Sequence, residues 1–394
     1  MTVVGIRDRV SNERHVRRVE QTFDLHDGDT RLLGARRPGD VIAVLLSTRR
    51  ARRDEQHRRR ATEHERERAG AAKERRNGPR SMRAMELHRF CSTSRVVIVA
   101  GKGGVGKTTV TAALATAAVR TGASVLIIEV EGKSGLATCL GCPPLEYEEQ
   151  VAPTGVRART LTPDQALLEY LEERGLRRVS KRLVRSGALD VVATAVPGMK
   201  DILVLGKVKQ LERADVADLV IIDAPAAGHA ITFLLSARGL LDAVRVGPVR
   251  KQAEEVIELL SDPERCQVML VTLPEETPVN ELVDTAFALE DRVGVKLGPI
   301  IVNAVPGDLA LTGVLASDDA ATLNLDLAPA DATSLDAAVE FRHERHALAL
   351  EQADRLATRL PLPQLRLPFV FGEIGPVEVD LLADVLTSEV AALP

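Results

Sequence analysis

Short apolar runs alternate with amphipathic stretches along most of the chain from residue 95 onward. Val96–Ala100 and Ser124–Val130 are typical runs, because they are short, rich in Val and Ile, and bounded by glycine or polar residues. The stretches between such runs, for example Pro163–Arg174 and Val249–Leu260, carry apolar residues at helical spacing. Strands that alternate with helices predict an α/β fold, with a mostly parallel central sheet flanked by helices. The other strands expected are Val156–Thr160, Leu219–Asp223, Val268–Thr272, Ile300–Asn303 and Leu365–Leu367, and the other helices are Thr108–Thr121, Val279–Val293 and Ser334–Leu360.

Residues 1–94 differ from the rest in both pattern and charge. Arg49–Arg60 and Glu63–Arg80 contain almost no apolar residues and cannot supply a packed core. Residues 1–94 carry 23 Lys/Arg and 14 Asp/Glu, whereas residues 95–394 carry 29 and 42. We therefore expect an Arg-rich, disordered extension over 1–94 and a catalytic domain over 95–394. One origin of such an extension is a start assigned upstream of the true one at Met82 or Met85. A solvated helical charge face, or a tail that binds nucleic acid or acidic lipid, are the alternatives for the extension.

Composition limits the class of protein and its compartment. The acidic domain over 95–394 lacks the clustered cations that nucleic-acid binding requires. Four cysteines in 394 residues do not form a disulfide framework, and no apolar run approaches the roughly 20 residues of a membrane span. We expect a cytoplasmic protein without a transmembrane segment. Cys139 and Cys142 have zinc-ligand spacing but supply only two ligands, so they are either structural or shared across a symmetric dimer.

The segment Gly101–Thr109, with the sequence GKGGVGKTT, lies between an expected strand and an expected helix. It fits the pattern G-x-x-x-x-G-K-[ST], in which backbone N–H groups cradle phosphate oxygens. Lys107 would bridge the β- and γ-phosphates, the Thr108 hydroxyl would coordinate Mg²⁺, and Thr109 would touch the α-phosphate. The loop residues expected to bind the nucleotide are Gly101, Gly103, Gly104, Val105, Gly106, Lys107, Thr108 and Thr109.

The same glycines also satisfy G-x-G-x-x-G, the fingerprint of a dinucleotide site, with Glu129 ending the next strand as the ribose-binding acid. The pair Lys107 and Thr108 favours the phosphate loop, because a dinucleotide site has no use for a lysine and a metal-binding hydroxyl there. Lys102 lies at the exposed lip of the loop. From there it could reach a phosphate held by a facing subunit, unless it is an ordinary exposed lysine.

A second expected strand supplies the residue that we predict to hold the metal ion. Asp218–Asp223 is an apolar run that ends in a carboxylate, where a P-loop sheet places the acid that holds Mg²⁺ through water. A helix N-cap is the alternative role for Asp223. The residues after it, Ala224–His229, are expected to form a loop in which Gly228 offers its N–H to the γ-phosphate.

These segments together resemble the arsenite-pump ATPase (ArsA) family, which includes relatives that target tail-anchored membrane proteins. Gly101–Thr109 resembles the family's lysine-signature loop, and Asp223–His229 resembles its D-T-A-P-T-G-H switch, with the proline one position early. Pro197–Gly198 occupies the family's P-G position. Asn303 falls where the family has an adenine-contacting asparagine, and Arg366–Gly372 resembles the loop that closes over adenine.

The resemblance implies a P-loop NTPase fold of the SIMIBI type and a dimer that binds ATP and Mg²⁺. It implies that Lys102 acts across the dimer. It also implies adenine contacts from Asn303 and from Leu367, Pro368 and Phe369 in the closing loop.

One departure from the family concerns the group that orients the attacking water. Where the family has an Asp, this chain has Glu131, one methylene longer and next to the potential ion partner Lys133. A misplacement of about an ångström can lower a rate about a hundredfold. Hydrolysis is therefore expected to be slow, or the segment around Glu131, the family's switch I, works differently in this chain. The form Glu-Val-Glu-Gly resembles ArsA-like paralogues of actinobacteria, which occur in pairs, so a homodimer and a heterodimer with a paralogous ATPase both stay open.

We therefore expect a Mg²⁺-dependent ATPase, with Lys102, Lys107 and Glu131 as catalytic residues, whose nucleotide state is coupled to dimer geometry and partner binding. A partition or septum-positioning ATPase is one alternative, and a nucleotide-dependent binding module with little turnover is another. A strict arsenite or tail-anchor function is disfavoured, because the metalloid-binding cysteines and a Met-rich client groove have no counterpart in the sequence.

Overall fold

The computed structural model describes residues 79–130, 135–173, 175, 178, 198–307 and 315–393. All of these belong to one compact unit, residues 73–394. Glu131, Lys133 and Pro197 lie outside the described residues. Among the described residues, no helix is both long enough and apolar enough to cross a membrane.

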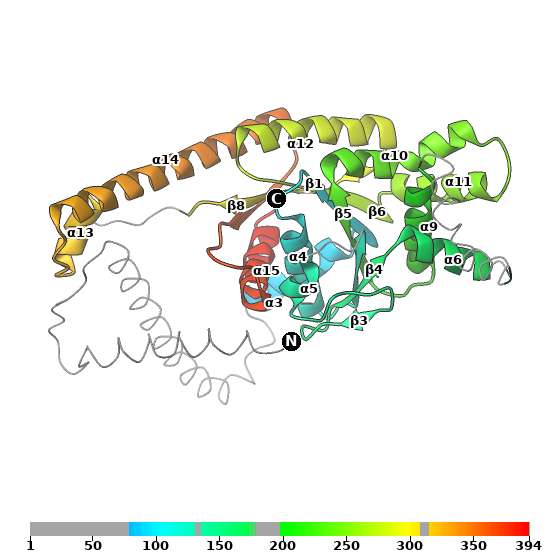
Figure 1. Ribbon diagram of the computed structural model, residues 1–394, viewed down its shortest axis with the longest axis horizontal. Coiled ribbons are helices and arrows are strands. Elements are labelled where there is room, and N and C mark those ends of the chain that lie inside the picture. Colours follow the sequence, from blue (N-terminus) through cyan, green and yellow to red (C-terminus); the bar gives the residue numbers. More distant parts are fainter. Residues whose placement is uncertain are drawn as a thin grey trace, which may run out of the picture. The chain divides into compact units, whose positions relative to one another are not determined.

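A nine-stranded sheet forms the centre of this unit, in the order β3-β4-β2-β5-β1-β6-β8-β9, with β7 paired to β6 (Figure 1). Within the residues that the structure describes, every pairing is parallel except that of β3 with β4, which confirms the predicted mostly parallel sheet. The strands are β1 (Val96–Gly101), β2 (Val125–Val130), β3 (Gln150–Val151), β4 (Arg157–Leu161), β5 (Leu219–Ala226), β6 (Cys266–Thr272), β7 (Lys296–Leu297), β8 (Ile300–Val305) and β9 (Gln364–Pro368).

Helices cover both faces of the sheet, because successive side chains of a strand point to opposite faces. On β1, Val97 and Val99 pack with α4 and α15, whereas Val96 and Ile98 pack with the helices on the other side. Figure 1 shows α15 (red) beside α4 on the first face and α9, α10 and α11 (green) on the second. The helices are α3 (Pro79–Cys91), α4 (Lys107–Arg120), α5 (Leu136–Leu140), α6 (Pro163–Glu173), α9 (Met199–Arg213), α10 (Ala227–Ala243), α11 (Pro248–Ser261), α12 (Glu276–Ala288, extended by a π-turn Leu289–Val293), α13 (Ala316–Thr322), α14 (Pro329–Arg359) and α15 (Pro376–Ala391).

The prediction of a loop over Ala224–His229 is wrong. The strand β5 runs on to Ala226 and α10 begins at Ala227, so Gly228 and His229 lie in the first turn of a helix. Pro225 is tolerated within β5 because the pairing with β1 shifts register between Asp223 and Ala226, and a bulge needs no hydrogen bond from the missing proline N–H.

The helix α3 lies before Arg95, inside the range that the sequence assigns to the extension. Its Leu87 and Cys91 are 1% and 4% exposed and belong to the core formed with α4 and α15. Arg83 also reaches the Ser388 hydroxyl of α15, at 3.4 Å. The packed unit therefore begins N-terminal to the first strand of the sheet.

Candidate nucleotide-binding site

The turn between β1 and α4 has the backbone of a phosphate loop. Gly104 and Gly106 adopt φ angles of 86° and 88°, in the left-handed region that favours glycine. A Cβ atom at Gly106 would lie only 2.3 Å from Asn303 Nδ2. A side chain at this position would therefore strain the backbone and displace Asn303. The helix α4 begins directly after it, at Lys107, without a side-chain cap on its first N–H groups.

The two lysines of the loop point in different directions. Lys107 Nζ donates to the carbonyl oxygen of Lys102 at 3.0 Å, so its ammonium lies across the loop. Burial lowers the pKa of Lys107, and the nearby Asp223 carboxylate opposes that shift. Lys102 Nζ instead forms an ion pair with Glu281 of α12, at 2.6 Å. The ammonium of Lys102 is thus held toward α12, whereas that of Lys107 stays at the loop.

Thr108 and Asp223, predicted as the metal-holding pair, lie side by side. The Thr108 hydroxyl donates to Asp223 Oδ2 at 2.7 Å, and Asp223 is 7% exposed in the second half of β5. Burial raises the pKa of Asp223 to about 6, the Thr108 hydroxyl and Lys107 oppose this, and the Glu129 carboxylate adds to it. The other carboxylate oxygen, Asp223 Oδ1, is buried and has no hydrogen bond of standard geometry to the described residues, and the neighbouring Thr111 hydroxyl also acts to lower the pKa of Asp223.

This pair fits Mg²⁺, a hard cation that takes oxygen ligands and commonly keeps several waters and substrate phosphates around one or two carboxylates. No group of three or more His, Cys, Asp or Glu side chains that could hold a metal occurs in the part of the chain that the structure describes. A hydroxyl and a carboxylate beside a phosphate loop are suited to a metal that brings its other ligands with the nucleotide.

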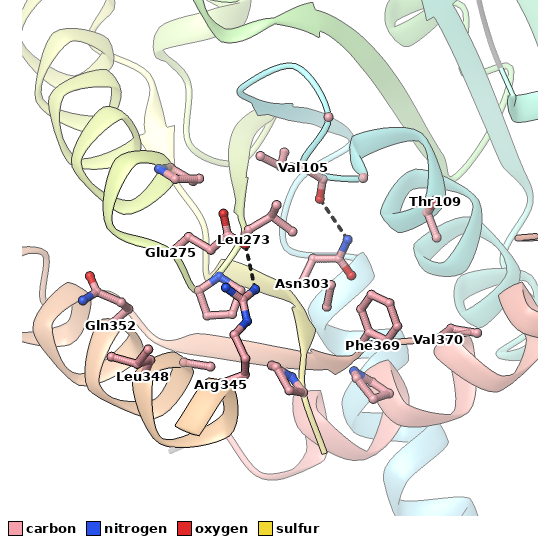
Figure 2. Close-up of a pocket in the computed structure, with 18 of the residues that line it drawn as sticks. Val105, Thr109, Leu273, Glu275, Asn303, Arg345, Leu348, Gln352, Phe369 and Val370 are labelled. Atoms are coloured by element: carbon pink, nitrogen blue, oxygen red, sulfur yellow. Dashed lines mark hydrogen bonds and ion pairs between the residues drawn. The ribbon is translucent and has the colours of Figure 1, made fainter. Parts of the chain in front are cut away.

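A cavity of about 670 Å³ opens beside the phosphate loop, between α12, α14 and the segment after β9 (Figure 2). Asn303, Pro368 and Phe369, predicted as adenine contacts, all line it. Asn303 Nδ2 donates to Val105 O at 2.9 Å, so this side chain also holds the loop backbone in place. These residues therefore form the wall of one cavity that adjoins the phosphate loop.

Leu367 does not line the cavity. It is 0% exposed and packs in the core on the α4 side of the sheet. The side chains of β9 alternate between faces, so the residue before Pro368 points into the core. The predicted contact of Leu367 with adenine stays a prediction, and with this side chain buried only the backbone of Leu367 could make it.

The structure adds polar and apolar lining residues that the sequence did not single out. Glu275, before α12, forms an ion pair with Arg345 of α14 at 3.1 Å, and Figure 2 shows this pair at the wall of the cavity. Leu348 and Gln352 follow on the same helix and also line the cavity. No motif links Glu275 to the three positions of α14, which lie 70 or more residues later in the chain. Only the packing of α14 brings them to the site.

Four other residues that the sequence singled out remain to be located. Glu131 lies outside the described residues, and Gly228 lies in the first turn of α10, where backbone N–H groups have no intrahelical partner. Cys139 is 5% exposed and Cys142 is partly buried, and burial raises the pKa of both thiols. Sharing of the two cysteines across a dimer stays a prediction.

Comparison with known proteins identifies the family. Residues 94–246 match the sequence model of the anion-transporting ATPases of ArsA type. The putative ATPase Mb3704 of Mycobacterium bovis and the ATPase BagA of Mycobacterium tuberculosis are each 32% identical to the chain over 300 residues, which are 70% of this chain and 87% of the relative. The arsenical pump-driving ATPase of Escherichia coli is 30% identical over 211 residues, 53% of this chain and 34% of that protein. The ATPase get3 of Schizosaccharomyces japonicus is 29% identical over 140 residues, 35% of this chain and 42% of that protein. The chain therefore belongs to the ArsA-type ATPase family of P-loop enzymes, which bind a nucleotide and hydrolyse ATP.

Proposed function

We propose that this ATPase is Mg²⁺-dependent and that it couples its nucleotide state to the geometry of a dimer and to the binding of a partner protein. The hydrogen bond from Thr108 to Asp223, directly beneath the phosphate loop, carries the metal part of the proposal. A buried carboxylate that accepts the hydroxyl of the first loop threonine leaves both groups facing the site where a nucleotide-bound metal belongs.

The residues divide the work of binding as follows. Backbone N–H groups from Gly101 to Thr109 bind the phosphates, and Lys107 places its charge between the β- and γ-phosphates. Thr108 and Asp223 hold Mg²⁺, which when bound neutralises negative charge on the phosphates. Asn303 and Phe369 contact the base in the adjoining cavity. Gly228, at the start of α10, is suited to donate its N–H toward the γ-phosphate, and Glu131 would orient the attacking water.

The direction of Lys102 supports the dimer part of the proposal. This side chain is 40% exposed and turned toward α12, whereas Lys107 occupies the space above its own loop. A cation at the rim of the loop is suited to a phosphate brought by a second subunit. A second copy of this chain or a paralogous ATPase could bring it.

The test uses the full chain. Phosphate release and mass in solution are measured with and without ATP and Mg²⁺ for the wild type, Lys107→Ala and Lys102→Ala. We expect Lys107→Ala to lose ATP binding and turnover, and Lys102→Ala to bind ATP but to lose the ATP-dependent increase in mass. Lys251→Ala, an exposed lysine of α11, should behave as the wild type. Unchanged turnover in Lys107→Ala would overturn the site, and a mass that is independent of ATP in the wild type would overturn the dimer coupling.

A further inference from the structure

The carboxyl ends of β2 and β5 bring two acidic side chains together. Glu129 is the register partner of Asp223 on the neighbouring strand. Register partners point to the same face of a parallel sheet, so both carboxylates lie on the α4 side, where Asp223 meets Thr108. They are 4% and 7% exposed. Two buried carboxylates in neighbouring positions repel each other, which is costly unless a cation is nearby.

A hydroxyl on the third strand fixes the orientation of Glu129. Thr160 of β4 is the register partner of Glu129 and donates its hydroxyl to Glu129 Oε2 at 2.5 Å. The strands β4, β2 and β5 thus present Thr160, Glu129 and Asp223 in a row, and this row continues to Thr108 at the start of α4. The row therefore ends at Asp223 and Thr108, the pair whose oxygen atoms are suited to bind Mg²⁺.

The cavity does not support the other role that the sequence left open for Glu129. A ribose-binding acid has to face the nucleoside, but Glu129 is not among the residues that line the cavity beside the phosphate loop. Its carboxylate lies on the Asp223 side of the phosphate loop instead.

We propose that Glu129 is a second carboxylate of the magnesium site and that, together with Asp223, it holds water molecules bound to the metal. The inference rests on the proposed function of the Thr108–Asp223 pair and extends it to a residue outside the phosphate loop. Mg²⁺ is commonly bound through one or two carboxylates and several waters, and it would remove the repulsion between the two buried charges. The buried atom Asp223 Oδ1, without a hydrogen bond of standard geometry in the described part of the chain, is a second acceptor for such waters.

The experiment measures metal binding directly, on the full chain. Mn²⁺ serves as the probe, and free Mn²⁺ is followed by electron paramagnetic resonance in the presence of saturating ADP. We expect Glu129→Gln to weaken Mn²⁺ binding roughly 10- to 100-fold, the range for groups that orient a metal's ligands, while ADP affinity in EDTA stays at the wild-type value. Asp223→Asn is the positive control. Glu146→Gln is the matched control. The side chain of Glu146 is exposed, and its backbone carbonyl accepts a hydrogen bond from the Thr160 N–H.

Thermal unfolding separates a metal role from a purely structural one. If Glu129 serves the metal, Glu129→Gln relieves repulsion, so Tm without metal stays equal or rises while the increase caused by Mg²⁺ and ADP shrinks. If Glu129 only anchors Thr160, Tm falls and the increase is unchanged. Should Glu129→Gln fail to fold, Glu129→Asp retains the charge one methylene further back and is expected to weaken Mn²⁺ binding several-fold.

Wild-type Mn²⁺ affinity in a folded Glu129 variant would overturn the inference. That result differs from a failure of the proposed function, in which the wild type itself would show no Mn²⁺ binding that depends on ADP.

Discussion

Lys102 Nζ donates to Glu281 Oε1 at 2.6 Å and thereby ties the lip of the phosphate loop to α12. The two side chains are 40% and 44% exposed, so the pair contributes only about 0.2–1 kcal/mol. A contact of this strength holds the lysine in the single subunit but can be exchanged for a stronger one. If Lys102 binds a phosphate across a dimer, it has to leave Glu281 first.

Glu281→Gln should therefore favour ATP-dependent association. The free energy of the pair corresponds to a decrease of about 1.5- to 5-fold in the ATP concentration at which half of the protein is dimeric. Light scattering over an ATP titration at low salt checks this, and the gain should vanish at high salt because exposed charges are screened. Glu290→Gln, an exposed acid beyond the end of α12, is the control. If Glu281→Gln needed more ATP than the wild type to make half of the protein dimeric, Glu281 would support association instead.

The close approach of Gly106 to Asn303 predicts unequal effects at two glycines of the loop. Gly104→Ala meets no atom within 4 Å and suffers only the left-handed backbone, at about 1–2 kcal/mol. Gly106→Ala has the same backbone cost, and its Cβ would lie 2.3 Å from Asn303 Nδ2. We expect kcat/KM for ATP to fall roughly tenfold in the first variant and more than about a hundredfold in the second.

A double variant tests whether the clash is the cause. Gly106→Ala with Asn303→Ala has room for the new methyl group and should have a higher kcat/KM than Gly106→Ala alone, although Asn303 also lines the cavity beside the phosphate loop. Equal losses at Gly104 and Gly106, or no recovery in the double variant, would contradict this explanation.

The sequence predicted the sheet, and it singled out Thr108 and Asp223, which the structure brings into contact, because both depend on local signals. Apolar runs rich in Val and Ile identify buried parallel strands. Motifs place Thr108 in the first helical turn after one such strand and Asp223 within another, although the two residues are 115 positions apart. The contact of Glu275 with Arg345 could not be predicted, because it depends on the direction in which α14 leaves the sheet. The loop expected after Asp223 was wrong because Pro225 indicates a turn, whereas a strand bulge absorbs it.

The raised pKa of Asp223 predicts how stability depends on pH. Its pKa is about 6 in the folded protein, against an ordinary value of 3.8. Between these values the folded protein binds a proton that the unfolded chain has lost, so the free energy of unfolding falls as the pH rises from about 4 to 6. The loss amounts to about 3 kcal/mol, at about 1.4 kcal/mol per pH unit.

Denaturant unfolding of the metal-free, nucleotide-free chain between pH 4.5 and 7.5 checks this. Asp223→Asn cannot ionise at this position, so its free energy of unfolding should fall less steeply over this range and exceed that of the wild type at pH 7.5. Mg²⁺ needs the ionised carboxylate, so the affinity for Mg²⁺ with ADP should increase as the pH rises through about 6. An identical pH dependence in the wild type and in Asp223→Asn would refute the assignment.

The packing of α3 on α15 predicts that residues before the first strand contribute to stability. Leu87 is 1% exposed and belongs to the same core as α4 and α15, so Leu87→Ala should lower the free energy of unfolding by about 2–5 kcal/mol. Met85→Ala is the matched control, since Met85 lies on the same helix, is 68% exposed and should change stability by less than about 0.5 kcal/mol. Urea unfolding of the full chain measures both. Equal, small effects would show that α3 is not part of the cooperative unit in solution, whereas the expected difference places the start of that unit at or before Leu87.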